Sequence, residues 1–339
     1  MKLDKLRVSY FQRKPRAGFN FSIEQIFDRI REELEAQINS RIVLSSRYNT
    51  GFISKLINIV QAAYKQDNSI SHITGEVHFL NFLMKKNRVV LTIHDCGMVK
   101  RKKGFAAILV KWLYLRGPVN RSAIVTTVSN TTKAEVIHYT KCDPEKVLVI
   151  PNPVATQFKF SPKEFNNEQP HILQIGTGPN KNLERLTESL IGLGCKLTIV
   201  GKLSEIQKKQ LQDSRILYNQ VYNISNEELL QCYISCDILA FVSTFEGFGM
   251  PIVEANALGR VVITSNVSSM PEVAGNAACM VDPYDVNSIR KGFERIINEK
   301  SYREELIENG VVNSLRFNAK TIAQQYYDVY RLIQEEKYE

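Results

Sequence analysis

The sequence lacks the features that would place the chain outside the cell or across a membrane. It contains no run of eighteen uncharged apolar residues, and its first eight residues hold no apolar signal core, so neither a membrane span nor secretion is expected. The six cysteines show no Cys-x-x-Cys spacing. Cys232 and Cys236 lie one helical turn apart and are expected to be buried thiols rather than metal ligands. We therefore expect a reduced, cytoplasmic protein.

Low-complexity tracts and short repeats are also missing. The 339 residues are 44% hydrophobic and 23% charged, which is a globular composition. This length exceeds one typical core and suits two domains. Residues 156–170 are polar and show no periodic pattern, so they are the expected linker between the domains.

Acidic residues are scarce in the first half of the chain. Residues 1–165 hold 27 Lys and Arg against 13 Asp and Glu, a net charge of +14, whereas residues 166–339 hold 17 against 22, a net charge of −5. A basic half suits nucleic acid, an anionic membrane surface or a phosphorylated substrate. The alternative is a basic surface that only keeps the protein soluble.

The stretch Glu246 to Glu254 joins a predicted strand to a predicted helix. Residues 236–243 form an apolar run with the length and β-branched content of a buried strand. Two glycines then open the backbone, and Pro251 favours the start of a helix that ends at Gly259. Such a loop offers free backbone N–H groups to an anion. With Glu246 in the loop and Glu254 in the first helical turn, it indicates a nucleotide-sugar site. The alternative is an ordinary strand–loop–helix crossover with surface glutamates.

The same half carries a candidate phosphate-binding cation. Strand 171–176 runs into loop 177–182, and a helix begins at Leu183. Lys181 lies at the start of this helix, where a cation can assist a phosphate bound by the helix N–H groups. Asn226 is the expected cap of a helix over 227–232. Further strands are predicted at residues 196–201, 215–221, 260–265 and 278–281.

The first half shows a similar alternation of strands and helices. Strands are predicted at residues 7–11, 41–45, 71–75, 88–95, 123–129 and 146–153. Gly18 lies in the loop between the first strand and a helix that starts at Ser22, and it indicates either a ligand site or a turn. His94 emerges at the carboxyl end of its strand, where it is well placed for chemistry. His72 and His78 fit a structural role better.

Residues 100–116 combine charge and apolarity. Four consecutive cations, residues 100–103, precede an apolar, helix-like run that contains Trp112, the only tryptophan. This composition is typical of a segment that lies on an anionic bilayer surface. A core-packed crossover helix with a solvated basic start is an equal alternative.

Several motifs together resemble a known family. Ile175-Gly-Thr-Gly-Pro-Asn-Lys-Asn-Leu183 and Ser243-Thr-Phe-Glu-Gly-Phe-Gly-Met-Pro-Ile-Val-Glu-Ala255 carry most of the resemblance. Weaker matches fall at residues 71–75, 91–95, 128–129, 149–153, 269–275 and 281–283. The chain resembles the retaining glycosyltransferases of family 4, also called glycosyl transferases group 1. Their α/β fold, GT-B, has two Rossmann-like domains that face each other across a cleft.

The resemblance implies the domain roles. Residues 1–165 would form an N-terminal acceptor-binding domain, and residues 166–320 a C-terminal domain that binds the nucleotide-sugar donor. The amphipathic helix expected at residues 321–334 would pack, with the rest of segment 321–339, back on the first domain.

The resemblance also implies a role for each candidate residue. Glu254 would accept hydrogen bonds from the ribose hydroxyls of the donor. Glu246, together with the backbone amides around Phe248, would hold the transferred sugar and the diphosphate. Lys181 would neutralise the diphosphate, His94 would lie beside the transferred sugar, and Gly18 would let its loop approach the diphosphate. The implied catalytic residues are thus His94, Lys181 and Glu246. The implied donor-binding residues are Gly18, Asn180, Lys181, Glu246, Gly247, Phe248, Gly249, Met250 and Glu254.

One departure from the family concerns the loop before Lys181. Many members have an arginine there, whereas this chain has residues Thr177 to Asn180. The leaving group would then be held by one cation, helix N–H groups and Asn180. Neither a metal nor a cofactor beyond the nucleotide-sugar is expected.

The expected function is sugar transfer from a nucleotide-sugar to a glycan or lipid-linked acceptor, in cell-surface polysaccharide or glycolipid synthesis. Contact with the inner membrane face through residues 100–116 is expected. One alternative is another GT-B enzyme, a nucleotide-sugar epimerase or a phosphorylase, which needs different carboxylate or cofactor placements. A second is a basic nucleic-acid-binding or membrane-binding protein without catalysis. Nucleic-acid binding requires cations interleaved with aromatics, and only residues 100–116 come near this, so no nucleic acid is expected.

Overall fold

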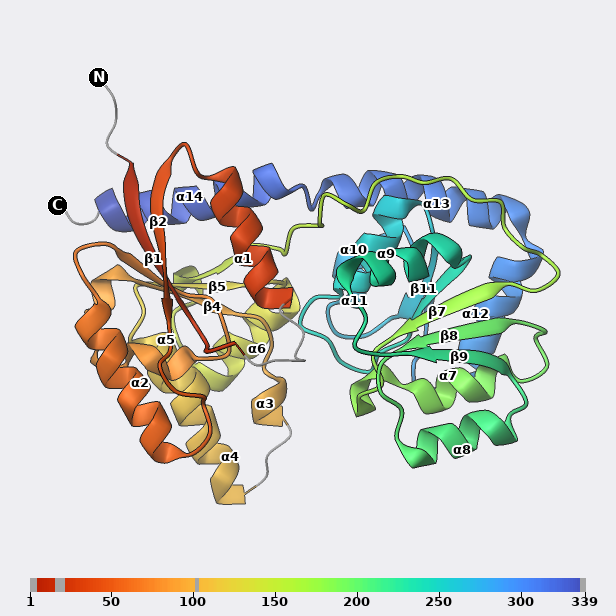
Figure 1. Ribbon diagram of the computed structural model, residues 1–339, viewed down its shortest axis with the longest axis horizontal. Helices are drawn as coiled ribbons and strands as arrows, with labels where there is room; N and C mark the ends of the chain where they lie inside the picture. The colour runs from red at the N-terminus through yellow and green to blue at the C-terminus, as the bar shows by residue number, and fades with distance from the viewer. Residues whose placement is uncertain (1–4, 16–21, 101–103, 336–339) are drawn as a thin grey trace. The chain divides into compact units, whose positions relative to one another are not determined.

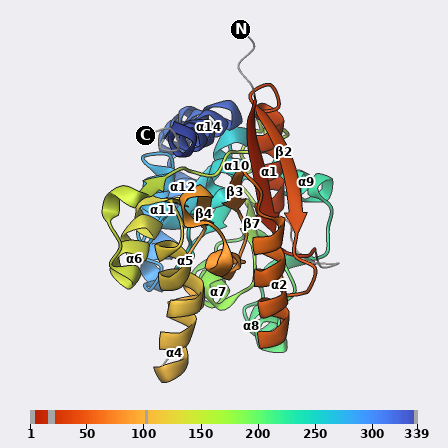
Figure 2. The ribbon, with the colours of Figure 1, turned by 90° about the vertical axis from the view of Figure 1, so that its left-hand side faces the viewer.

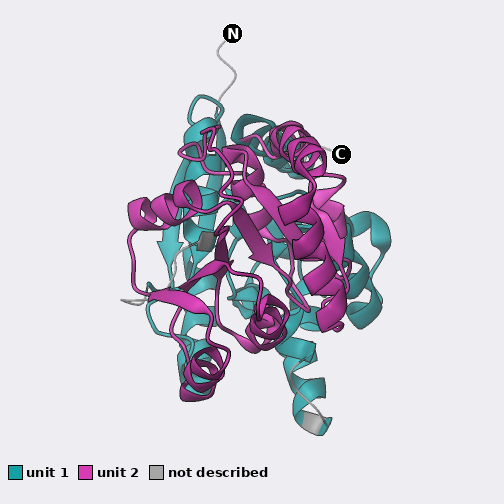
Figure 3. Cartoon of the chain, turned by 90° about the vertical axis from the view of Figure 1, so that its right-hand side faces the viewer, with its two compact units in different colours: residues 1–153, 319–339 teal, residues 154–318 magenta. Residues whose placement is uncertain are grey.

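The computed structural model describes residues 5–15, 22–100 and 104–335 (Figure 1). The chain forms two compact units (Figure 3). Unit 1 comprises Met1–Pro153 and Ala319–Glu339, and unit 2 comprises Val154–Asn318. Each unit contains one parallel six-stranded sheet with helices packed against it. The predicted α/β class with two Rossmann-like sheets is therefore confirmed.

The sheet of unit 1 has the strand order β2-β1-β3-β4-β5-β6, and every neighbouring pair is parallel. Because side chains alternate between the faces of a strand, Val8 and Tyr10 of β1 enter one apolar cluster and Phe11 enters another. The strands are β1 (Leu6–Gln12), β2 (Ile38–Leu44), β3 (Ile70–Ile73), β4 (Val89–Ile93), β5 (Ile124–Thr127) and β6 (Val147–Val149).

The two clusters of unit 1 are covered by different helices. Helices α1 (Ser22–Glu33) and α14 (Ala319–Glu335) fill one cluster, and α2 (Phe52–Lys65), η1 (His78–Leu83), α5 (Gly117–Asn120) and α6 (Asn130–Thr140) contribute to the other. Tyr330 of α14 places its hydroxyl 2.8 Å from Nδ1 of His72 and 3.0 Å from the hydroxyl of Tyr10. Burial lowers the pKa of His72 to about 3, so this histidine is a neutral core residue.

The segment after His94 is not one continuous helix. It consists of α3 (Gly97–Lys100), α4 (Gly104–Lys111), a π-helical turn η3 (Trp112–Arg116) and α5. Its early apolar residues, including Ile108 and Trp112, are exposed, whereas Leu115 and Val119 are buried. Of the four consecutive cations at residues 100–103, the last three lie outside the described residues. Among the described residues, no helix has both the length and the apolarity needed to cross a membrane.

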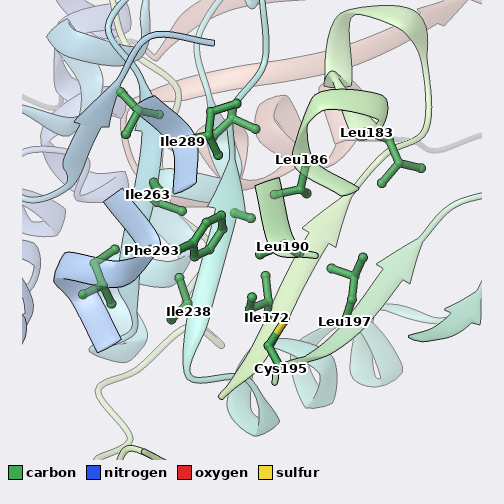
Figure 4. Close-up of a cluster of buried hydrophobic side chains, with 14 of the residues drawn as sticks. Ile172, Leu183, Leu186, Leu190, Cys195, Leu197, Ile238, Ile263, Ile289 and Phe293 are labelled. Atoms are coloured by element: carbon green, nitrogen blue, oxygen red, sulfur yellow. The ribbon is translucent and has the colours of Figure 1, made fainter. Parts of the chain in front are cut away.

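The sheet of unit 2 has the order β12-β11-β10-β7-β8-β9, again with parallel neighbours. Apolar side chains from the sheet and from α7 (Leu183–Leu190) and α12 (Val286–Asn298) form its core, as Figure 4 shows with Ile172, Leu186 and Phe293. The strands are β7 (His171–Ile175), β8 (Lys196–Val200), β9 (Leu217–Val221), β10 (Ile238–Phe241), β11 (Val261–Ser265) and β12 (Cys279–Val281).

The helices of unit 2 follow its strands along the chain. Ser225, not the predicted Asn226, caps α9, because its hydroxyl accepts from the Glu228 N–H while the Glu228 carboxylate accepts from the Ser225 N–H. The predicted cap was therefore wrong by one residue. The helices are η5 (Pro179–Lys181), α7 (Leu183–Leu190), α8 (Glu205–Asp213), α9 (Asn226–Ser235), α10 (Met250–Leu258), α11 (Met270–Ala274), α12 (Val286–Asn298) and α13 (Lys300–Leu315).

The segment that joins the units packs on unit 2 from residue 154 onward. Phe158 is buried with its ring edge-to-face on Tyr233, and Lys163 forms an ion pair with Asp237. Residues 154–165, which the sequence analysis counted with the first domain, thus belong to unit 2 in the structure. Sequence periodicity does not reveal this packing, because the segment contains neither a helix nor a strand.

Candidate functional site

The strand order of unit 2 reverses between β7 and β10. The chain runs outward from β7 to β8 and β9 and then returns to the other side of β7 at β10. In an open parallel sheet, ligands bind beyond the carboxyl ends of the strands at such a reversal. Here the loops that follow β7 and β10 meet, since the Thr244 N–H donates to the Asn180 carbonyl at 2.8 Å.

The two loops bring three of the predicted site residues together. Lys181 Nζ lies 2.7 Å from Glu246 Oε1, and Asn180 Nδ2 donates to the same oxygen at 3.1 Å. The Lys181 and Glu246 side chains are only 20% and 16% exposed, and Lys181 Nζ lies 4.6 Å from the centroid of the Phe241 ring. An ammonium group has three N–H donors and this contact uses one, so Lys181 can also bind an incoming anion.

The backbone of the β7 loop shapes the position of Lys181. Gly176 has a φ of 87°, and a Cβ at this position would lie 2.8 Å from Lys181 Cε. The lysine stem therefore rests directly over the glycine. Asn182, also in the left-handed region at φ 58°, donates from Nδ2 to the carbonyls of Val242 and Pro283. Asn182 ties this loop to the loops after β10 and β12.

The loop that carries Glu246 is held by the two serines that directly precede α11. The hydroxyls of Ser268 and Ser269 lie 2.7 and 3.0 Å from the Glu246 carbonyl, and Ser269 also lies 2.7 Å from the Phe248 carbonyl. Phe248 is buried against Phe317, so it is the backbone of Phe248, not its ring, that a ligand could contact. The loop ends at Gly249 (φ 120°), which precedes Met250, the first residue of α10. Pro251 has no N–H and the Ile252 N–H donates to the Gly249 carbonyl at 3.0 Å, so the Met250 N–H is the first-turn donor that an anion could meet here.

Glu254 lies one turn along α10 and has a different partner. Its Oε2 accepts a hydrogen bond from the hydroxyl of Tyr233 on α9, which is fully buried. Burial raises the pKa of Glu254 to about 7 and that of Tyr233 well above its ordinary value. Within the described parts of the chain, the second oxygen of Glu254 accepts no hydrogen bond, which leaves an acceptor for a ligand hydroxyl.

In unit 1, His94 follows β4 and lines a cavity of about 70 Å³, together with Glu76, His78 and Asp95. His94 Nε2 lies 3.0 Å from the Thr74 carbonyl, so this nitrogen carries the hydrogen. Burial lowers the pKa of His94 to about 4, and the ring is therefore neutral at pH 7. His78, whose Nδ1 lies 2.7 Å from the Tyr114 carbonyl, also has a lowered pKa because it is buried.

The structure adds one residue that the sequence analysis missed in this region. Arg13, which directly follows β1, lies 2.7 Å from Glu24 and 3.5 Å from Glu76 of the cavity wall. The hydrogen bond with Glu24 raises the pKa of Arg13. Gly18, predicted in the same loop, lies outside the described residues. Across those described, no three His, Cys, Asp or Glu side chains converge as metal ligands do.

Known structures share this two-sheet architecture along the whole chain. Sucrose-phosphate synthase from Thermosynechococcus elongatus matches with a TM-score of 0.79 at 15% identity, over 98% of this chain and 100% of that one. The Anabaena protein Alr3699/HepE, solved with UDP and glucose, matches with a TM-score of 0.72 at 15% identity, over 96% and 99%. The protein thus has the fold of the GT-B glycosyltransferases.

Sequence comparison gives the family. Residues 156–311 match the family described as Glycosyl transferases group 1, and residues 31–158 match Glycosyltransferase Family 4. The chain belongs to this family and is a glycosyltransferase. The predicted family and enzyme class are confirmed, and the alternative of a binding protein without catalysis is wrong.

Several relatives are mannosyltransferases. O-antigen chain mannosyltransferase B of Escherichia coli is 25% identical, over 76% of this chain and 74% of its own length. The serotype-specific mannosyltransferase WbdA of Escherichia coli is 28% identical over 58% of this chain. The chain spans 27% of the length of WbdA, so WbdA contains much that has no counterpart here.

Proposed function

We propose that the protein transfers a hexose, with mannose as the first candidate, from a nucleotide-sugar to a glycan or lipid-linked acceptor in the synthesis of a cell-surface polysaccharide. The observation that carries this proposal is the meeting of Lys181, Asn180 and Glu246 at the strand reversal of unit 2, beside the start of α10. The names of the relatives, which include the O-antigen chain mannosyltransferase RfbU of Salmonella typhimurium, support mannose and polysaccharide assembly.

Unit 2 is the proposed donor-binding unit. The diphosphate would lie against the Met250 N–H at the start of α10 and the Lys181 ammonium group, which together supply positive potential. The free oxygen of Glu254 would accept from a ribose hydroxyl, while Tyr233 holds the other oxygen. Glu246 and the backbone from Gly247 to Met250 would contact the transferred sugar and the diphosphate. Asn180 holds Glu246 in place through its Nδ2, which donates to Glu246 Oε1 and to the Phe245 carbonyl.

The proposed reaction retains the configuration of the sugar. The bond between the anomeric carbon and the diphosphate oxygen breaks, and the acceptor oxygen bonds to the same carbon on the same face. The acceptor proton passes to the departing diphosphate. Negative charge grows on the leaving group, so Lys181 and the Met250 N–H stabilise the transition state more than the ground state. Neutral His94, whose Nε2–H donates to the Thr74 carbonyl, would position the sugar by accepting a hydrogen bond from a sugar hydroxyl at Nδ1 and would not act as nucleophile.

Unit 1 is the proposed acceptor-binding unit. The cavity beside His94 presents carboxylates from Glu76 and Asp95, and such acceptors suit the hydroxyl groups of a sugar. Residues 100–116 are a proposed contact with an anionic membrane, since Ile108 and Trp112 are exposed next to a basic sequence. A lipid-linked acceptor would be presented at that surface.

A donor screen tests the proposal. Thermal unfolding is measured with GDP-mannose, UDP-glucose and other nucleotide-sugars, and the release of nucleoside diphosphate is followed for each. A true donor present at 100 times its Kd stabilises the fold by about 2.7 kcal/mol. We expect one donor to raise Tm and to be hydrolysed slowly. If no nucleotide or nucleotide-sugar raises Tm, the proposed donor site is wrong.

A further inference from the structure

Helix α2 exposes an apolar face to solvent. The opposite face of the helix, with Asn58, Ile59 and Ala62, is buried in unit 1. An amphipathic helix normally presents polar side chains to water, and a contiguous apolar patch usually marks an interaction site. The exposed side chains, from 40% to 87% accessible, are Phe52, Ile53, Leu56, Ile57, Val60 and Tyr64.

This face continues to α4 through η1. The 3₁₀ segment η1 contacts α2 on one side and the π-helical turn after α4 on the other. Across the second contact, the rings of Phe82 and Trp112 stack with centroids 5.0 Å apart. Leu83 of η1 and Ile108 and Leu109 of α4 are all more than half exposed. Figures 1 and 2 show α2 and α4 extending toward the same end of unit 1. We call the exposed apolar residues of α2, η1 and α4, with Trp112, the two-helix face.

The charge around the two-helix face has one sign. Residues 36–134 contain 15 Lys and Arg but only three acidic residues. Of these three, Asp67 is paired with Arg41, and Glu76 and Asp95 line the cavity beside His94. Helix α2 itself carries Lys55 and Lys65 and no acid. Glu135, just beyond this range, pairs with Lys100. The elements that form the face, α2, η1, α4 and η3, carry Lys55, Lys65, Lys111 and Arg116 and no acidic residue, so their net positive charge can meet an anionic partner.

We propose that the two-helix face, with α2 as its larger part, docks on the surface of an anionic lipid bilayer. This inference deepens the membrane contact proposed for residues 100–116 and rests on it in part. Apolar side chains of an interfacial helix enter the boundary between headgroups and acyl chains, while lysines extend to the phosphates. Each cation near an anionic surface adds attraction that falls off within a Debye length. Docking would hold the proposed acceptor unit where a lipid-linked acceptor is accessible.

Trp112 offers a direct measurement, because it is the only tryptophan and lies half-exposed in the two-helix face. The full chain is mixed with vesicles of 30% phosphatidylglycerol in phosphatidylcholine, and with vesicles of phosphatidylcholine alone. We expect flotation, a blue shift of the emission and protection from iodide quenching with the anionic vesicles only. Binding should weaken in 0.5 M NaCl, because salt screens the attraction. Absence of both flotation and shift at low salt would overturn the inference and the membrane contact of residues 100–116 together.

A matched pair of triple variants tests the part played by α2. The test variant carries Phe52→Gln, Ile53→Gln and Val60→Gln, all on the exposed side of α2. The control variant carries Ile206→Gln, Val312→Gln and Leu315→Gln, which are exposed helical residues of unit 2 (67–76% accessible, against 52–80% for the test residues). We expect the test variant to lose roughly tenfold or more in its vesicle partition coefficient, because three apolar side chains no longer insert. The control should bind like the parent protein.

Two results would overturn the role of α2. The first is that the test variant floats with vesicles as the parent does, while an Ile108→Gln/Leu109→Gln variant does not. This result would leave residues 100–116 as the sole membrane contact. The other is a lipid-free dimer, seen by sedimentation, that the test variant dissociates, which would assign the face to a second copy of the chain. Circular dichroism and Tm establish that each variant is folded. Slow donor hydrolysis should be the same in all variants, so failure of the docking inference is distinguishable from failure of the donor site.

Discussion

The ion pair between Lys181 and Glu246 allows a catalytic role to be separated from a structural one. Replacing the lysine by Lys181→Met keeps most of its apolar stem over Gly176 but removes the charge. A preorganised cation beside a leaving group contributes on the order of 10²–10³ in rate, about 3–4 kcal/mol. The stability cost should be smaller, about 1–2 kcal/mol, since both side chains keep some contact with water and Asn180 still donates to Glu246. For a unit of this size, that cost lowers Tm by about 2–8 °C.

The assay is a double-mutant cycle that records kcat/KM and Tm for Lys181→Met, Glu246→Gln and the double variant. The double variant removes both charges, so we expect it to recover part of the lost Tm but none of the activity. Lys208→Met is the matched control, because Lys208 makes a 2.8 Å ion pair with Glu205 on the exposed part of α8. It should leave both quantities unchanged. A folded Lys181→Met enzyme with more than a tenth of the parent activity, or a double variant that recovers activity along with Tm, would refute the reasoning.

Two further predictions concern buried hydrogen-bonded groups. Burial raises the pKa of Glu254 from 4.5 to about 7, so the native state binds the proton more tightly than the unfolded chain, and stability should fall as pH rises between these values. Urea unfolding at pH 5 and pH 7.5 should show this fall in the parent but not in Glu254→Gln. The same change in unfolding free energy between the two pH values in both proteins would contradict the assignment. Tyr330→Phe leaves His72 and Tyr10 without a shared partner and should lower stability by about 1–3 kcal/mol. Tyr327→Phe, half-buried on the same helix, is the control in thermal unfolding, and an equal loss in both would show that the hydroxyl of Tyr330 does not matter.

The sheets were predictable because their strands are short runs of apolar residues, many of them β-branched. The run from Cys236 to Ser243 predicts a buried strand, and β10 lies within it as Ile238–Phe241. The π-helical turn at Trp112–Arg116 was not predictable, because it coincides with a tertiary contact. A Cβ on Gly117, directly after the turn, would lie 2.6 Å from the ring of Phe82, so this glycine lets η1 approach closely. No local pattern near Gly117 encodes the position of Phe82.

The candidate site was predictable where it is built from short motifs and not where it is built from distant partners. Asn180, Lys181 and Glu246 belong to two motifs whose loops follow adjacent strands, and the structure brings them together. Tyr233 is 21 residues from Glu254, and Arg13 is 63 residues from Glu76. Such pairs depend on the packing of α9 beside α10 and on the order of β1 and β3. A single sequence does not contain that information in any periodic form.

The two units use their charges in different ways, and this difference bears on how a donor would bind. In unit 1 residues 36–134 contain 15 Lys and Arg against three acidic residues, so this part of the chain has a net positive charge that acts on an approaching anion. In unit 2 Lys181 is already paired with Glu246, and the pair is neutral until a diphosphate arrives. The incoming anion must then share the ammonium group with the carboxylate, which also repels it. Donor binding should therefore weaken the contact between Lys181 and Glu246 and free the Glu246 oxygens to accept from sugar hydroxyls. On this argument the ion pair keeps the empty site ordered, and the donor itself converts it into the sugar-binding form.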